Sequence, residues 1–102
     1  MQLRKYRWSR HYESAEEELQ SFLAAKNLDA VRWTAEAGDE FATQRVDHHR
    51  LLFCAEGSLS LTADGKAFSL QPGDALELPA GTDHHATAGL AGVVCYEVRV
   101  QP

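Results

Sequence analysis

The stretch GDALELPAGTDH, from Gly73 to His84, decides the fold of this chain. It follows Pro72, and the resulting Pro-Gly pair is a turn signal. Residues 75–78 then form a short, mostly apolar run compatible with a strand, with Glu77 as the one polar residue. The Pro-Ala-Gly sequence at 79–81 ends that strand, because proline cannot donate to a β ladder and glycine adopts positive φ angles easily. The sequence therefore predicts a hairpin that holds His84 at the start of the next strand, directed at whatever the sheet encloses.

Short strand-like runs continue on both sides of this hairpin. Turn signals separate them, and Asp64-Gly65 is the strongest hairpin signal among these. Regular spacing of short strands and turns indicates a sandwich or a barrel. The expected strands are 31–35, 41–46, 49–55, 58–63, 67–70, 75–78, a short strand after His84, and 93–100, with a turn at 89–92 before the last of them.

The first 29 residues have a different pattern and are expected to form an arm and a helix packed on the barrel of residues 30–102, within a single domain. Tyr6, Trp8 and Tyr12 share parity, which favours an edge strand. Residues 14–26 predict a helix, because Ser14 and Glu17 match a capping box and an apolar stripe follows at helical spacing.

Composition limits the function classes. The 102-residue chain is 44% hydrophobic and 25% charged, with a net charge of −5, so a basic surface for nucleic acid or anionic membranes is not expected. No apolar run approaches the roughly 20 residues that span a bilayer, and none follows the basic amino terminus as in a signal peptide. Cys54 and Cys95 lie in apolar runs and are expected to be buried thiols in a reducing compartment, which predicts a cytoplasmic protein.

The spacing from Gly73 through Pro79 and Gly81 to His84 resembles the second motif of the cupin family of small barrels, the RmlC-like jelly roll. In that family the histidine is a metal ligand. The family motif ends with asparagine four residues later, where this chain has Ala88. The resemblance covers about residues 30–100 and implies an all-β, cupin-type β-barrel or jelly roll with one helix near the amino terminus.

The first motif of the family, two histidines and a glutamate before a glycine, matches less well. Glu56-Gly57 resembles its end, and counting back from Gly57 places Arg50 at the glutamate position. The histidine positions fall on Gln44 and Val46, or on Thr43 and Arg45 with the longer spacing. Of the three histidines and one glutamate that the family uses for its metal, only His84 is in register.

Two further histidines lie close to this segment and keep a metal hypothesis open. His48 has the parity of Arg50, Leu52 and Cys54, and a bulge would exchange it for His49. Imidazole suits Zn²⁺, Ni²⁺ and Fe²⁺. On this hypothesis His84, with His48 or His49 and a contribution from Gln44 or Glu97, binds one divalent ion.

The alternative is a diverged site in which Arg50 replaces the metal. A guanidinium disfavours a dication and holds a carboxylate through paired hydrogen bonds. The expected ligand pocket consists of Gln44, His48, Arg50, Leu52, Cys54, Leu76 and His84. One functional hypothesis is therefore a stand-alone barrel that binds a small polar or carboxylate ligand. A second is a metal-dependent oxygenase, isomerase or decarboxylase acting on a small organic acid, and a third is a purely structural or protein-interaction domain. Whether the chain is an enzyme therefore stays open.

Residues 93–100 form a long apolar run, and an exposed edge of that kind favours a homodimer. Trp8 and Trp33 are expected to be packing residues rather than platforms for a ligand.

Overall fold

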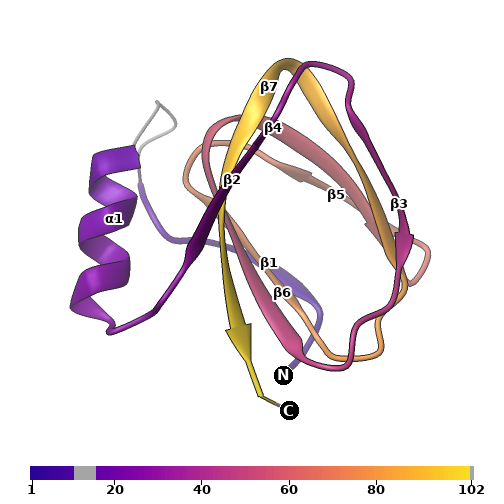
Figure 1. Ribbon diagram of the computed structural model, residues 1–102, viewed down its shortest axis with the longest axis horizontal. Coiled ribbons are helices and arrows are strands. Elements are labelled where there is room, and N and C mark those ends of the chain that lie inside the picture. Colours follow the sequence, from indigo (N-terminus) through magenta and orange to yellow (C-terminus); the bar gives the residue numbers. More distant parts are fainter. Residues whose placement is uncertain (11–15, 102) are drawn as a thin grey trace.

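The protein is mainly β, with one helix lying against a rolled sheet (Figure 1). The computed structural model describes residues 1–10 and 16–101. The elements are β1 (Arg4–Arg7), α1 (Glu16–Ala25), β2 (Val31–Ala35), β3 (Glu40–Gln44), β4 (His49–Ala63), β5 (Lys66–Leu70), β6 (Asp74–Leu78) and β7 (His84–Val100). The all-β class and the single helix predicted from the sequence are confirmed.

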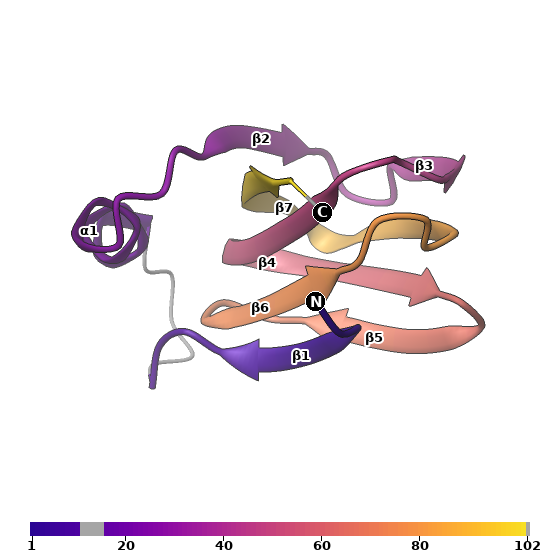
Figure 2. The same ribbon diagram turned by 90° about the horizontal axis from the view of Figure 1, so that it is seen from below.

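The antiparallel pair β4 and β7 forms the centre of the structure. The first half of β4 pairs with β6, which pairs with β1, and the second half pairs with β5. The first half of β7 pairs with β3 and its second half with β2. Because the neighbours change along each long strand, the sheet folds over on itself, and Figure 2 shows β2 and β3 above the β4–β7 pair with β1, β5 and β6 below it.

Both central strands bend without ending. The ladder between them shifts register on either side of Glu56-Gly57, and Gly57 and Gly92 have φ angles of 70° and 73°. A Cβ atom on Gly57 would lie 2.0 Å from the carbonyl oxygen of Gly92, so only glycine allows the strands to approach this closely. The sequence predicted separate strands at 49–55 and 58–63 and a turn at 89–92. The structure corrects both expectations, because glycine bulges bend the strands while the ladder continues.

The sheet has two apolar faces with separate cores. The inner core fills the roll and consists of Leu52, Cys54, Leu59, Leu61, Ala63, Leu70, Leu76, Leu78, Ala86, Ala88, Val93 and Cys95. The outer core lies between the sheet and α1 and consists of Trp8, Leu19, Leu23, Phe53, Ala55, Ala75, Tyr96 and Val98. Alternate residues of β4 and β7 therefore enter different cores, as the two-residue repeat of a strand requires.

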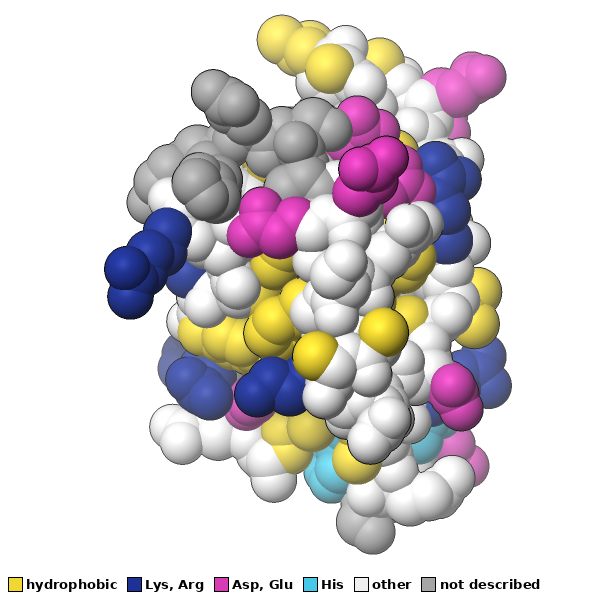
Figure 3. Space-filling model, turned by 90° about the vertical axis from the view of Figure 1, so that its left-hand side faces the viewer, with side chains coloured by type: hydrophobic (Ala, Val, Ile, Leu, Met, Phe, Trp, Pro, Cys, Tyr) yellow, Lys and Arg dark blue, Asp and Glu magenta, His cyan; other side chains and the backbone are white. Residues whose placement is uncertain are grey.

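Helix α1 is fixed to the outer face by polar contacts as well as by packing. The Tyr96 hydroxyl donates to Glu16 Oε1 at 2.8 Å and accepts from Gln20 Nε2 at 2.8 Å. Figure 3, which faces the helix, shows acidic side chains gathered around its first turn, where the positive end of the helix dipole favours them. Residues 16–25 confirm the helix predicted from the sequence, whereas the Ser14 cap and Tyr12 lie outside the described residues.

The structure bears on two predictions, the homodimer and the buried thiols. Residues 93–100 lie between β4 and β2, not at an edge, so the argument for a homodimer loses its basis and the dimer stays a prediction. Cys54 and Cys95 are fully buried free thiols opposite each other in the β4–β7 ladder, as expected. No helix in the described part of the chain has the length and apolar character needed to cross a membrane.

Candidate functional site

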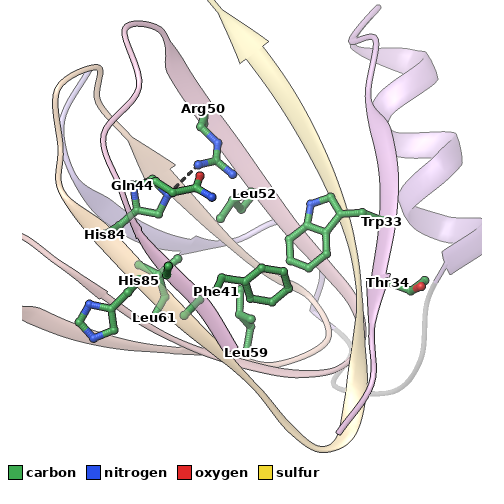
Figure 4. A pocket seen from close by; sticks show the side chains of 12 residues that line it. Trp33, Thr34, Phe41, Gln44, Arg50, Leu52, Leu59, Leu61, His84 and His85 are labelled. Atoms are coloured by element: carbon green, nitrogen blue, oxygen red, sulfur yellow. Dashed lines mark hydrogen bonds between the residues drawn. The ribbon is translucent and has the colours of Figure 1, made fainter. Parts of the chain in front are cut away.

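A cavity of about 230 Å³ lies inside the roll, between β2 and β3 on one side and the central strands on the other. Figure 4 shows that its two ends differ: Arg50, Gln44 and His84 gather at one end, and Trp33 and Phe41 lie at the other. The full lining is Trp33, Thr34, Phe41, Ala42, Gln44, Arg50, Leu52, Leu59, Leu61, His84, His85 and Ala86. The ring of His85 points away from the other labelled side chains (Figure 4).

The turn before β7 holds His84 at the polar end. Gly81 N donates to the Val46 carbonyl at 2.8 Å, and Ala80 N donates to His49 Nδ1 at 2.9 Å. These contacts fasten the turn to the start of β4, so the hairpin predicted from residues 73–84 is present and His84 begins the following strand. The imidazole is 7% exposed and lines the cavity.

The rim beside this turn carries an exposed ion pair. Arg45 holds Asp83 through two hydrogen bonds, of 2.7 and 2.9 Å, and these lower the pKa of the carboxyl group. The two side chains are 66% and 50% exposed, so water screens their attraction. The pair joins the segment before β4 to the turn and does not border the cavity.

Two hydrogen bonds define the state of the His84 ring. Its Nδ1 lies 3.3 Å from the Thr82 carbonyl oxygen, which can only accept, so Nδ1 carries the proton. Its Nε2 lies 2.6 Å from Arg50 NH1, which can only donate, so Nε2 is the acceptor. Burial, opposed by the Thr82 contact and aided by the Arg50 charge, lowers the pKa of His84 below its ordinary value. His84 is therefore a neutral ring that orients the guanidinium of Arg50.

Arg50 is the only cation that lines the cavity among the described residues. Its NH2 donates to Glu97 Oε1 at 2.5 Å, and the two side chains are 12% and 15% exposed. Its Nε is buried and has no hydrogen-bond partner in the part of the chain that the structure describes. A guanidinium has five N–H groups, so contacts to His84 and Glu97 leave donors for a further acceptor.

A second arginine stands beside Arg50 in the ladder. Arg99 of β7 is directly opposite Arg50 of β4, and Glu97 lies two residues before Arg99. Directly opposite residues of an antiparallel pair project from the same face of the sheet. Arg99 is nevertheless exposed and does not line the cavity, so Arg50, with its partner Glu97, is the cation that the cavity presents.

The described residues do not fit a metal ion of the kind that the resemblance implies. A metal ligand needs a free lone pair, and the Nε2 lone pair of His84 is used by Arg50. Glu97, the nearest carboxylate, also pairs with Arg50. No group of three or more histidine, cysteine, aspartate or glutamate side chains within residues 1–10 and 16–101 is placed to hold a metal.

The residues predicted from the sequence to form the site fall into three groups in the structure. Gln44, Arg50, Leu52 and His84 line the cavity together. Cys54 and Leu76 are buried in the inner core and do not border the cavity. His48 and His49 lie outside the cavity, because β4 begins only at His49, whose ring accepts from the turn at Ala80. The ring of His48 lies 3.4 Å from Asp47.

The aromatic end of the cavity is a finding of the structure. Trp33 lines the cavity, so the expectation that it only packs is incomplete. Its ring and that of Phe41 meet edge to face, with centroids 5.4 Å apart and planes at 65°. The alternation of residues 31–35 was the available signal, but only the pairing of Trp33 with Cys95 shows that this face of β2 is the inner one. Leu59 and Leu61 complete the apolar lining.

Comparisons with known proteins agree with this architecture. The family model described as "Cupin domain" matches residues 31–89, more than half of the chain. An RmlC-like cupin from Shewanella frigidimarina is 24% identical, with a TM-score of 0.66 over 74% of this chain and 67% of that one. A DUF861 family protein from Thermotoga maritima is 20% identical, with a TM-score of 0.65 over 94% and 97%. KdgF from Halomonas is 18% identical, with a TM-score of 0.63 over 98% and 82%. These identities support the shared fold alone, and no curated protein sequence matches the chain.

Proposed function

The chain belongs to the cupin family, and on that premise we propose that its barrel binds one small molecule through a carboxylate held by Arg50. The observation that carries this proposal is the buried guanidinium at one end of an otherwise largely apolar cavity. A planar guanidinium binds a carboxylate through two parallel, charge-assisted hydrogen bonds. The neutral ring of His84 and the carboxylate of Glu97 hold the guanidinium in place before a ligand arrives.

The Arg50–Glu97 pair leaves room for an anionic ligand. Burying a charge without a partner is costly, so a ligand carboxylate needs a hydrogen-bonding cation beside it. Arg50 keeps N–H groups that neither His84 nor Glu97 uses, and these can donate to a ligand carboxylate.

The proposal rests on the arginine because the described residues do not form a metal-ligand set. In the register of the family motifs, Arg50 stands where a glutamate ligand would stand, and its guanidinium reaches the one histidine that remains in register. The proposed function is therefore that of a binding barrel with a diverged metal site.

Calorimetric titration with a matched pair of small molecules tests this function. Sodium propionate and propanamide have nearly the same shape, but only propionate carries a charge. At constant ionic strength we expect propionate to bind the wild-type protein and propanamide to bind at least tenfold more weakly. Arg50→Gln should lower propionate affinity at least tenfold, because the charged fork is lost.

Arg4→Gln is the matched control for the arginine. Arg4 also pairs with a glutamate, Glu77 on β6, but its side chain is 55% exposed on the outer face. The same change in net charge should leave propionate binding unchanged there. Arg50→Lys, which keeps the charge without the fork, replaces Arg50→Gln if the latter fails to fold. Equal binding of acid and amide, or undiminished binding by both Arg50 variants, would show that Arg50 is not the anchor.

A metal titration in the same experiment examines the other hypothesis. Zn²⁺, Ni²⁺ or Fe²⁺ should neither bind the wild-type barrel near stoichiometry nor strengthen propionate binding. Stoichiometric metal that is lost in His84→Ala would favour the metal-dependent hypothesis over this proposal.

A further inference from the structure

The cavity is too long and too apolar at its far end for a carboxylate alone. Arg50, His84 and Gln44 occupy one end, and the aromatic pair Trp33 and Phe41 forms the other (Figure 4). A short acid held by Arg50 would leave the aromatic end without contacts, and the dispersion energy of those walls would be lost. The remainder of the ligand therefore decides the fit.

The size of the cavity limits that remainder to about one ring. An apolar protein cavity of about 150 Å³ holds a benzene molecule. The present cavity of about 230 Å³ accommodates one ring of that size together with a carboxylate group. Two fused or linked rings with a carboxylate exceed it.

The chemistry of the walls disfavours a sugar acid. A sugar carries hydroxyl groups around its whole ring, and each buried hydroxyl without a partner costs about 1–3 kcal/mol. Beyond the polar end, the walls consist mainly of Leu52, Leu59, Leu61 and the two aromatic rings. The side chains of Thr34 and His85 are directed away from them (Figure 4). The leucine and aromatic side chains offer hydroxyl groups almost no hydrogen-bonding partners, whereas a ring without polar substituents needs none.

The arrangement of Trp33 and Phe41 favours a flat ring in particular. Their edge-to-face geometry, at a centroid distance of 5.4 Å, is one that aromatic rings prefer. A third ring entering beside them extends the same kind of contact, and such aromatic pairs contribute beyond the area that they bury. Both side chains are half-buried, so they have surface left to cover.

We propose that the ligand is a monocarboxylate of a single aromatic ring, of the benzoate class, with its carboxylate on Arg50 and its ring against Trp33 and Phe41. This inference rests on the proposed carboxylate-binding function and adds the class of ligand. Arg50 is the one arginine that lines the cavity among the described residues, so the site offers a partner to one carboxylate rather than two.

A series of four probes tests the class of ligand by calorimetry: sodium benzoate, sodium cyclohexanecarboxylate, sodium propionate and benzamide. We expect benzoate to bind at least tenfold more tightly than propionate, and cyclohexanecarboxylate to fall between them because its puckered ring is thicker. Benzamide should bind at least tenfold more weakly than benzoate, because it lacks the charge that Arg50 recognises.

Two variants locate the ring. Trp33→Leu and Phe41→Leu should each remove most of the preference for benzoate over propionate while leaving propionate affinity unchanged. Phe68→Leu is the matched control: Phe68 is a half-buried aromatic residue that packs on the inner core but does not line this cavity. It should retain the wild-type preference for benzoate.

The indole N–H signals provide a readout that is independent of affinity. The chain has two tryptophans, and Trp8 lies in the outer core with its Nε1 3.3 Å from the Cys54 carbonyl oxygen. Benzoate should shift the indole NMR signal of Trp33, assigned by its loss in Trp33→Leu, and leave that of Trp8 in place.

The outcomes separate the class of ligand from the function beneath it. If propionate and benzoate bind equally, and both depend on Arg50, the benzoate class is overturned and the carboxylate function stands. If neither acid binds, the carboxylate-binding function and the benzoate class are both overturned. If benzoate binds without dependence on Arg50, or shifts the Trp8 signal and not that of Trp33, the geometry assigned to the ligand is wrong.

Discussion

The two faces of strand β4 have little in common. Phe53 and Ala55 project outward into the core beneath α1, whereas Arg50, Leu52 and Cys54 project into the roll. Helix α1 covers the outer side and is held there by hydrogen bonds with Tyr96. The inner side keeps a cavity of about 230 Å³ and a buried guanidinium.

Two arginine–glutamate pairs show the difference most directly. Arg4 and Glu77, on the outer face, are 3.3 Å apart, and the arginine side chain is 55% exposed. Arg50 and Glu97, on the inner face, are 12% and 15% exposed and share their cluster with His84. Water screens the outer pair, whereas the inner pair is largely shielded from water and therefore interacts more strongly. Alternation along one strand thus places the core beneath α1 and the cavity on opposite faces of the sheet.

The largest expected effect removes a side chain from the outer face. Phe53→Ala should lower the free energy of unfolding by about 4 kcal/mol, because a fully buried aromatic residue leaves a cavity. Carboxylate affinity should stay at its wild-type value in the folded fraction. Urea unfolding and calorimetry measure the two quantities. Leu52→Ala, on the inner face, should lower both the free energy of unfolding and the carboxylate affinity. A loss of carboxylate affinity in Phe53→Ala would show that the two faces are coupled.

Arg50→Glu should create a metal site on the inner face. The variant places a second carboxylate beside Glu97 and frees Nε2 of His84, which together make three donors of the kind that Zn²⁺ accepts. At zinc concentrations a hundredfold above the dissociation constant, binding should stabilise the variant by about 2.7 kcal/mol. The wild-type protein should show no such gain in thermal unfolding. Absence of a zinc effect in the variant would contradict the register that places Arg50 at the glutamate position.

Glu97→Gln tests the inner pair without removing its arginine. The amide keeps an acceptor for Arg50 but loses the charge, so the free energy of unfolding should fall by about 2 kcal/mol. Propionate affinity should rise, because the ligand no longer competes with a neighbouring carboxylate. Glu77→Gln on the outer face should cost less than about 1 kcal/mol and leave affinity unchanged. Equal effects of the two substitutions on urea unfolding would remove the contrast between the faces.

The smallest expected effect is a dependence of stability on pH from His84. Burial lowers its folded pKa below the ordinary value of 6.5, so just below pH 6.5 the unfolded chain binds a proton that the folded chain does not. Stability therefore falls as the pH drops below 6.5 and stops falling, for this group, below the folded pKa. Urea unfolding of wild-type protein and His84→Gln across this range should show a smaller acid loss in the variant. Identical slopes would mean that His84 is not buried as a neutral ring.

Several features of the fold and site were readable from the sequence because they depend on local backbone chemistry. The proline and glycines between Gly73 and His84 specify two turns, and those turns place His84 at the start of β7. Counting residues back from Gly57 assigned Arg50 to the position where its guanidinium reaches His84. In contrast, the bends at Gly57 and Gly92 looked like strand ends, since a glycine that bends a ladder and one that ends it look alike in sequence.

The sequence by itself determined the order of strands, the turns and the residue types that the inner face of β4 carries. Only the tertiary structure decided which side chains share the cavity, because its walls come from β2, β3, β4 and β7, which are distant in sequence. The aromatic end exists because β2 and β3 both pair with β7 and so bring Trp33 and Phe41 together, and no local pattern encodes that approach. The exclusion of His48 and His49 was likewise decided by where β4 begins, a boundary that depends on ladder pairing across the sheet rather than on the two residues themselves.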